Sequence, residues 1–439
     1  MTAPSKKNGD ALVDALRTGG TAKKASPPPP AQTEGAQLAY VLAVGCLLRI
    51  CILVMFGNFV HDYLPGRVEL STPVTSFKRL SEGLHLSAHN ISPYNGGVFH
   101  QSPLLLLAFK GLYYLPEAFS DAVYIAMDVL IALGLAKLAG ARVARAAQQV
   151  GVPGETRFVC RPSVVAALYL FNPLVVATSL AKSTIVFSHA AIIGALYFGL
   201  QGLVNWAVVC TAIATHLSIY PVMLIAPISL MTHSRSIAAT VLKFTALVLL
   251  LHTLFVAIYG VEYFTATVDF TIRVSDLQPN VGLFWYFFIE IFDEFRAFFI
   301  VVFQLTALAF AVPVAYRFRF EPLFAGILLV GIMSALKSYP AWGDLALFLG
   351  LLPIYEDLLK YTQYVFLSAN LLMFGVGLAP VFWHLWIEQG SGNANFFYAA
   401  TLVYVFGQIT VLFDLGSAML RRELDIHEPE TRTRTVVQE

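Results

Sequence analysis

Apolar residues follow one another in long runs along most of this chain, and short polar turns separate the runs. The runs recur from Gln37 to Leu420. A helical crossing of the roughly 30 Å hydrocarbon core needs about 20 apolar residues, so the pattern predicts an all-α, polytopic transmembrane bundle of about 12 spans. The expected apolar segments are 40–60, 102–117, 119–140, 162–180, 184–203, 204–217, 219–232, 237–260, 284–316, 321–336, 344–359, 362–386 and 396–418.

The chain divides into three regions by composition. Residues 1–35 combine lysines with a Pro27 to Pro30 run and few large apolar side chains, so we expect a disordered N-terminal tail. Residues 36–421 form the expected transmembrane domain, and residues 422–439 a cytosolic C-terminal tail. The first apolar run lies too far from the N-terminus for a cleaved signal peptide, which predicts a retained first helix.

A polar stretch at 61–101 follows the first apolar run and is expected to be a luminal loop. Within it, Val74, Phe77, Leu80 and Leu84 keep helical spacing, which predicts an interfacial helix. Asn90 begins an acceptor sequence for N-glycosylation, but a proline follows that sequence directly, and the occupancy of the site is left open.

Basic residues at the ends of the apolar runs predict the orientation, because cytosolic loops carry an excess of lysine and arginine. The basic groups are the N-terminal tail, 142–161, Arg317 with Arg319, and Arg421 with Arg422. Between Gln101 and Arg142 the chain has two apolar runs where the orientation requires one crossing. Either one of these runs is re-entrant, or the basic loop is luminal. In the first case four polar turns face the lumen, near 61–101, 261–281, 337–343 and 388–395.

Composition narrows the class of protein further. Hydrophobic residues make up 57% of the chain and charged residues 13%, and the net charge is +1. These values exclude an ordinary soluble domain and a nucleic-acid-binding surface. The four cysteines show neither zinc spacing nor a disulfide framework, and we expect buried, unreactive thiols. We also expect no metal and no cofactor.

Two features of the sequence bear on catalysis or ligand binding: known motifs, and charged residues inside the apolar runs. The sequence contains no Walker loop, GxGxxG, HExxH, GxSxG or paired CxxC motif. Charge in hydrocarbon is costly and often marks a polar cavity or a partner, although such side chains also pair within a bundle or reach its interface. Both interpretations stay open for Arg49, Asp128, Lys182, Asp344 and Asp414.

Three patches in the expected luminal turns are candidates for a binding site. The first, 278–290, places five consecutive aromatic residues after a turn, which suits either a lipid contact or an interfacial aromatic belt. In the second, 337–344, Lys337 either meets a phosphate or extends to the interface. In the third, 383–398, Asn393 and Asn395 lie two residues apart, as paired amides for sugar hydroxyls or as helix caps.

These patches carry a family resemblance. The order PNVGLFWYFFIEIFDEF, LKSYPAWGDLALF and FWHLWIEQGSGNANFFYAATL resembles the phosphatidylinositol-glycan class U subunits of GPI transamidase. The resemblance extends upstream to RVELSTPVTSFKRLSEGL, ISPYNGGVFHQSPL and FNPLVVATSLAKST, and so covers Ala39 to Arg422.

The resemblance implies a multi-pass protein of the endoplasmic reticulum membrane that binds and presents the GPI lipid without catalysing the transfer. It also implies a complex with the K, S and T subunits and the GPI anchor attachment protein, with catalysis in the K subunit. The expected site residues are Asn393, Asn395, His384 and Lys337 for the GPI glycan, and Phe284, Trp285, Tyr286, Phe287 and Phe288 for lipid contact.

The same family looks related to the GPI mannosyltransferases of the GT-C class, whose SPY and TPL-like patterns appear here at 92–94 and 102–104. Those enzymes carry an acidic pair after the first span, where this chain has the single Glu69, with Asp62 at a different spacing. The alternative function is therefore an active dolichol-phosphate-mannose-dependent GPI mannosyltransferase. A transporter is a third hypothesis, and no inverted repeat in the sequence supports it.

Overall fold

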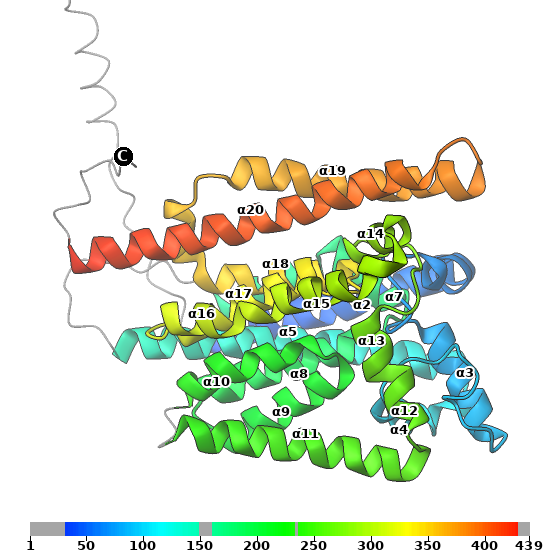
Figure 1. The fold of residues 1–439 in the computed structure, drawn as a ribbon. Coiled ribbons are helices and arrows are strands. Elements are labelled where there is room, and N and C mark those ends of the chain that lie inside the picture. Colours follow the sequence, from blue (N-terminus) through cyan, green and yellow to red (C-terminus); the bar gives the residue numbers. More distant parts are fainter. Residues whose placement is uncertain (1–30, 149–159, 233–235, 429–439) are drawn as a thin grey trace, which may run out of the picture.

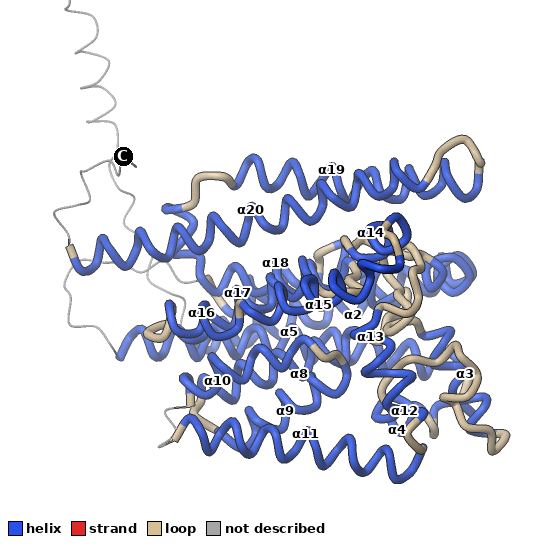
Figure 2. Tube along the Cα trace, in the orientation of Figure 1, coloured by secondary structure: helices blue, strands red, loops and turns tan. Residues whose placement is uncertain are grey.

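The fold comes from a computed structural model that describes residues 31–148, 160–232 and 236–428. Within these ranges every regular element is helical and no strand occurs (Figure 2), which confirms the all-α prediction. Most of the expected N-terminal tail and part of the C-terminal tail lie outside the described residues. Helix α20 continues to His427, beyond the predicted domain boundary at 421.

The helices run mostly side by side along one direction (Figure 1). The first half of the chain contains α2 (Ala31–Tyr63), η1 (Leu64–Gly66), α3 (Phe77–Ala88), α4 (Pro103–Phe109), η2 (Leu112–Tyr114), α5 (Glu117–Gln148), α6 (Pro162–Leu170), α7 (Pro173–Leu180), α8 (Ile185–Leu200), α9 (Val204–Leu217), η3 (Tyr220–Leu224) and α10 (Ile225–Met231). The second half contains α11 (Ile237–Tyr259), α12 (Glu262–Phe264), η4 (Thr265–Asp269), α13 (Phe270–Arg273), α14 (Phe284–Glu290), α15 (Asp293–Ala309), α16 (Ala311–Arg317), α17 (Pro322–Leu336), α18 (Trp342–Leu351), η5 (Leu352–Tyr361), α19 (Val365–Trp383), η6 (His384–Glu388) and α20 (Ala394–His427).

Among the described residues, 6 helices are long and apolar enough to cross a membrane. Helices α6 and α7 add a seventh crossing if this pair, bent by 57°, is one span. Four further apolar helices are shorter: α8, α9, η3 with α10, and α17. The structure therefore confirms a polytopic membrane protein.

The apolar run 102–117 contains only the seven-residue helix α4 and the short η2. At a rise of about 1.5 Å per residue, α4 extends about 10 Å, a third of the hydrocarbon core. Helix α5 is thus the one long crossing between Gln101 and Arg142. This geometry favours the first of the two predicted orientations, in which one of the two runs does not cross.

Ion pairs bring three of the predicted basic groups to one end of the bundle, which we call the basic end. Arg142 Nη2 lies 2.8 Å from Asp357 Oδ1, and Arg422 Nε lies 3.0 Å from the other oxygen of the same carboxylate. Arg317 Nη1 lies 2.9 Å from Glu423 Oε2. The opposite end, which we call the loop end, carries α3, α4, α12, α14 and the tip of the α19–α20 hairpin (Figure 1).

Charged residues inside the apolar runs are paired within the bundle. Arg49 Nε lies 2.7 Å from Asp128 Oδ2, and both side chains are buried. Lys182 Nζ lies 2.6 Å from Glu117 Oε1 and 2.9 Å from Asp121 Oδ1. Such pairing offsets the cost of placing charge in the membrane. For these residues the structure supports the structural interpretation.

Helices α19 and α20 form a closely packed antiparallel hairpin (Figure 1). A Cβ atom at Gly375 would lie 2.7 Å from the Cβ of Tyr404 and 2.8 Å from its Cα, so only glycine fits there. Small residues allow helix backbones to approach in this way. At the basic end, the Asp414 carboxylate accepts hydrogen bonds from the backbone N–H groups of Gln363 (2.8 Å) and Tyr364 (2.9 Å), which fixes the start of α19 against α20.

Candidate functional site

The predicted amide pair lies in the turn between η6 and α20, residues 389–395, which we call the amide turn. Asn393 caps α20, because its Oδ1 accepts hydrogen bonds from the backbone N–H groups of Asn395 (3.1 Å) and Phe396 (3.4 Å). Both asparagine side chains belong to exposed residues. The capping role of Asn393 uses its oxygen and leaves its amide nitrogen available.

The second amide of the turn connects two of the three predicted patches. Tyr286 of α14 donates a hydrogen bond from its hydroxyl to Asn395 Oδ1. The Tyr286 ring also stacks on Tyr398 of α20, with a centroid distance of 4.6 Å. The aromatic patch and the amide turn are therefore neighbours on one surface.

His384 lies at the same tip, at the first position of η6. Its Nδ1 is 2.5 Å from Glu388 Oε2, and both side chains are about half exposed. Gly390 in the turn has a positive φ of 62°, a conformation that glycine adopts without strain. The tip thus presents an imidazole, a carboxylate and two amides toward solvent.

The five aromatic residues predicted to contact lipid divide between interior and surface positions. Phe284, Trp285 and Phe288 are buried, whereas Tyr286 and Phe287 are partly exposed. Trp285 packs in a cluster with Phe397 and partly buried residues of the hairpin. Phe284 and Phe288 pack in another cluster that reaches α15. Three of the five residues thus hold α14 in place, and two keep partial exposure, although Phe287 also packs on Phe299 and Phe303.

Trp285 also carries an unusual polar group. Its indole Nε1 is buried and has no hydrogen-bond partner among the described residues. Its ring lies 6.3 Å from that of Trp386, which lies in η6, in a stacked arrangement. The rings of Trp285, Trp386 and Phe397, which we call the aromatic platform, therefore pack next to the amide turn.

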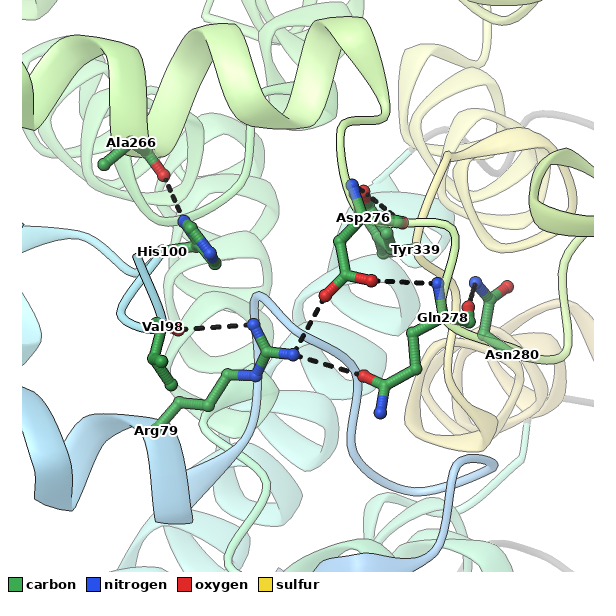
Figure 3. A network of polar contacts seen from close by, with 8 residues as sticks. All are labelled: Arg79, Val98, His100, Ala266, Asp276, Gln278, Asn280 and Tyr339. Carbon is green, nitrogen blue, oxygen red and sulfur yellow. Dashed lines mark hydrogen bonds and ion pairs between the residues drawn. The ribbon is translucent and has the colours of Figure 1, made fainter. Parts of the chain in front are cut away.

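Figure 3 shows the contacts that hold the loop before α14. Arg79 of α3 donates from Nη2 to Asp276 Oδ2 (2.9 Å) and from Nη1 to the carbonyl oxygen of Val98 (3.2 Å). Asp276 in turn accepts from the backbone N–H of Gln278 (3.0 Å), and Tyr339 donates to its backbone oxygen (2.8 Å). Helix α3 and the 337–341 turn thus both contact this loop.

His100 makes the neighbouring connection in the same view (Figure 3). Its Nδ1 donates to the carbonyl oxygen of Ala266, 2.9 Å away, and its ring stacks on Phe270 at 3.6 Å. Burial lowers the pKa of His100 from its ordinary value, and the nearby Arg79 adds to the effect. Sequence reasoning missed Arg79, His100 and Asp276, and the only signal was their position in polar turns.

Lys337 lies in a different environment from the other predicted glycan-binding residues. It is buried, and its Nζ donates to Asp344 Oδ1 at 2.6 Å. Asp344 Oδ2 accepts from the backbone N–H of Ala341 at 2.9 Å, which caps the start of α18. Lys337 and Asp344 both line an internal cavity of about 260 Å³, together with His189.

The single acidic residue after the first helix is held in a buried ion pair. Arg67 donates to both carboxylate oxygens of Glu69, at 2.7 and 3.1 Å, and Glu69 is 1% exposed. The backbone oxygen of Glu69 also accepts from Trp342 N–H at 2.8 Å, which ties this loop to α18. Asp62 is exposed at the end of α2. The two acidic residues thus lie in different environments.

These observations define a polytopic, all-helical membrane protein with a polar, amide-bearing tip above an aromatic platform. Residues 43–404 match the family described as GPI transamidase subunit PIG-U, and the chain belongs to this family.

Curated relatives align over most of their own length. The GPI transamidase component GAB1 of Saccharomyces cerevisiae is 37% identical over 395 residues, which cover 88% of this chain and 96% of the relative. The GPI-anchor transamidase component PIGU of Homo sapiens is 31% identical over 422 residues, which cover 88% and 94%. The protein of that name from Cricetulus griseus is 32% identical over 422 residues, with the same coverage.

Proposed function

We propose that this protein is a non-catalytic component of GPI transamidase in the endoplasmic reticulum membrane, where it binds the GPI lipid and presents it for attachment to proprotein C-termini. Family membership and the names of the curated relatives support the assignment to GPI transamidase. The proposed partners are the K, S and T subunits and the GPI anchor attachment protein, with the chemistry performed in the K subunit.

The observation that carries the binding role is the adjacency of the amide turn and the α14 aromatic residues. Tyr286 connects the two, and the exposed amides of Asn393 and Asn395 lie above buried and partly exposed rings. A GPI molecule has a glycan with many hydroxyls and a lipid with long acyl chains. Amide groups suit the first and an aromatic surface suits the second.

We assign glycan contact to Asn393, Asn395 and His384, and lipid contact to the partly exposed Tyr286 and Phe287. Phe284, Trp285 and Phe288 act from beneath by fixing the position of α14. Lys337 lines the internal cavity, so a sugar contact there would take place inside the bundle.

The proposed scaffold is GT-C-like with about 12 crossings. The crossings would be α2, α5, α6 with α7, α8, α9, η3 with α10, α11, α15 with α16, α17, α18 with η5, α19 and α20. The shorter members reach about 18–24 Å at 1.5 Å per residue, which a locally thinned bilayer accommodates. In this order an even number of crossings separates Arg142 from Arg422, so both residues lie at the same end of the bundle. Their ion pairs with Asp357 agree with that placement.

Presentation contributes to the reaction by positioning. A GPI molecule held at the loop end meets a neighbouring active site without a separate encounter, which lowers the entropic part of the barrier. The paired state of Glu69 supports the non-catalytic assignment, because a carboxylate bound to Arg67 at both oxygens is a poor general base.

The test is the double substitution Asn393→Ala and Asn395→Ala in the assembled complex. The complex should assemble normally, capture at least several-fold less GPI, and display fewer GPI-anchored proteins at the cell surface. Asn370→Ala is the matched control, because Asn370 is also an exposed amide but lies within α19. Unchanged GPI capture by the double variant would refute the proposal.

A further inference from the structure

The internal cavity lies between helices α8, α9, η3, α11, η4 and α18 and has a volume of about 260 Å³. Its lining is polar in an unusual way for a membrane bundle, since four histidines contribute to it: His100, His189, His216 and His252. None of these residues belongs to the amide turn. Val74, Thr75 and Ser102, which flank or belong to the expected luminal loop, also line the cavity, which places it toward the loop end.

Two polar atoms of the lining have no hydrogen-bond partner among the described residues. They are His189 Nε2 on α8 and Thr215 Oγ1 on α9, and both atoms are buried. His189 is 3% exposed, and its Nε2 lies 3.9 Å from Asp344 Oδ1, which is beyond hydrogen-bond distance. Buried polar groups without partners are uncommon and costly, so these two atoms are available to hydrogen-bond a polar molecule in the cavity.

The two cavity histidines His216 and His252 differ from these two atoms because they have partners within the protein. Ser102 Oγ lies 2.7 Å from His216 Nδ1, and the Tyr263 hydroxyl lies 2.9 Å from His216 Nε2. His252 Nδ1 lies 2.7 Å from the same tyrosine hydroxyl. These contacts hold the two histidines in place, whereas His189 Nε2 and Thr215 Oγ1 keep free hydrogen-bonding capacity.

The charges that line the cavity favour a neutral ligand over an anion. Lys337 and Asp344 neutralise each other at 2.6 Å, so their pair brings no net charge to the cavity. An anion such as phosphate would have to displace the Asp344 carboxylate from Lys337. A neutral molecule with several hydroxyls avoids this competition, because it donates to Asp344 and exchanges hydrogen bonds with His189 and Thr215.

The size of the cavity and its apolar lining further restrict the class of ligand. Ile185, Ile192, Val330, Met333 and Leu347 contribute apolar surface to the same cavity. A pyranose ring has hydroxyls at its edge and C–H groups on its faces, which suits a cavity of mixed lining. The volume of about 260 Å³ lies just below the usual range of about 300–1,000 Å³ for drug-sized ligands, so the cavity suits a ligand portion of about one sugar ring.

We propose that this cavity binds one neutral monosaccharide unit, held by His189, Thr215 and the Lys337–Asp344 pair. The unit is either a free sugar or the terminal residue of a lipid-linked glycan, because both present the same ring. The site is distinct from the amide turn but shares Lys337 with the glycan contacts of the proposed function, so variants of the two sites are tested separately.

Binding is measured on the purified complex in lipid nanodiscs, because glycoside detergents would compete for the site. The probes are methyl glycosides of mannose, glucose, galactose and N-acetylglucosamine, followed by saturation-transfer NMR. At least one should bind, and octyl mannoside distinguishes the source: tighter binding than methyl mannoside indicates a lipid-linked sugar, and equal binding a free sugar. Inorganic phosphate should not compete.

The deciding variants are Thr215→Val and His189→Gln, each expected to weaken sugar binding about 5- to 10-fold, the size of one lost hydrogen bond. Thr240→Val is the matched control, because Thr240 Oγ1 is also buried without a partner but lies outside the cavity. The double variant of the amide turn should leave this binding intact. The proposal is overturned if no glycoside binds at tens of millimolar, if phosphate binds instead, or if Thr240→Val and Thr215→Val have equal effects.

Discussion

Tyr286 donates its hydroxyl to the side-chain oxygen of Asn395, although the two residues are 109 positions apart in the chain. This contact joins the aromatic patch of α14 to the start of α20 and orients the Asn395 amide. Orientation matters, because an amide that is already held in place loses less entropy when a ligand binds.

Tyr286→Phe should therefore weaken GPI capture about 2- to 10-fold while leaving assembly unchanged, because one hydrogen bond contributes about 0.5–1.5 kcal/mol. The measurement is the amount of GPI that co-purifies with the complex. Tyr316→Phe serves as control, since Tyr316 is exposed and lies on α16 at the basic end. Equal capture by wild type and Tyr286→Phe would contradict an orienting role.

The Arg79–Asp276 pair should stabilise the loop before α14. Both side chains are partly exposed, so solvent screening limits the expected coupling to about 0.5–1 kcal/mol. A double-mutant cycle with Arg79→Ala and Asp276→Ala, followed by thermal unfolding in nanodiscs, measures this coupling. Purely additive effects of the two substitutions would show that the pair contributes nothing.

Glu69→Gln should destabilise the protein by about 3–5 kcal/mol, because it leaves Arg67 buried without its counter-charge. Replacement of both residues by methionine should cost less than either single change. Thermal unfolding compares the stability of the Glu69→Gln, Arg67→Met, Glu69→Met and double methionine variants. The same samples are assayed for mannosyl transfer from dolichol-phosphate-mannose. Transfer by the wild type that Glu69→Gln abolishes would establish the enzymatic alternative instead.

His100 should make stability depend on pH. Its pKa is lowered in the folded protein by burial, so the unfolded chain binds a proton first as the pH falls. Stability is unaffected above about pH 6.5, the ordinary histidine value, and declines as the pH drops below it. His100→Gln, which keeps a hydrogen-bond donor for Ala266, should flatten this decline relative to wild type. A decline of the same slope in both proteins would assign it to other groups.

Much of the fold could be predicted from the apolar runs, because the length and polarity of a segment decide whether it can cross a bilayer. The interfacial helix α3 was expected near 71–86 and occupies Phe77–Ala88. The run 284–316 was expected as one segment but contains α14, α15 and α16. Helix α14 ends before Ile291, whose backbone is extended, and Asp293 and Glu294 lie in the first turn of α15, where acidic side chains favour a helix start.

The candidate site was predictable only in part. The residue types of the amide turn and the α14 patch stand out in the sequence, and the structure places them together. Their contacts with other segments could not be foreseen, because Arg79 and Asp276 are 197 positions apart and nothing local relates them. The same holds for His189 and Lys337, which only the helix packing brings to one cavity.

The close contact of Gly375 with Tyr404 has a mechanical consequence. Two helices packed this closely cannot slide past each other or separate without losing that contact. The position of the hairpin tip is therefore set relative to its other end. There Arg422 and Glu423 pair with Asp357 and Arg317, which fixes α20 to the rest of the bundle.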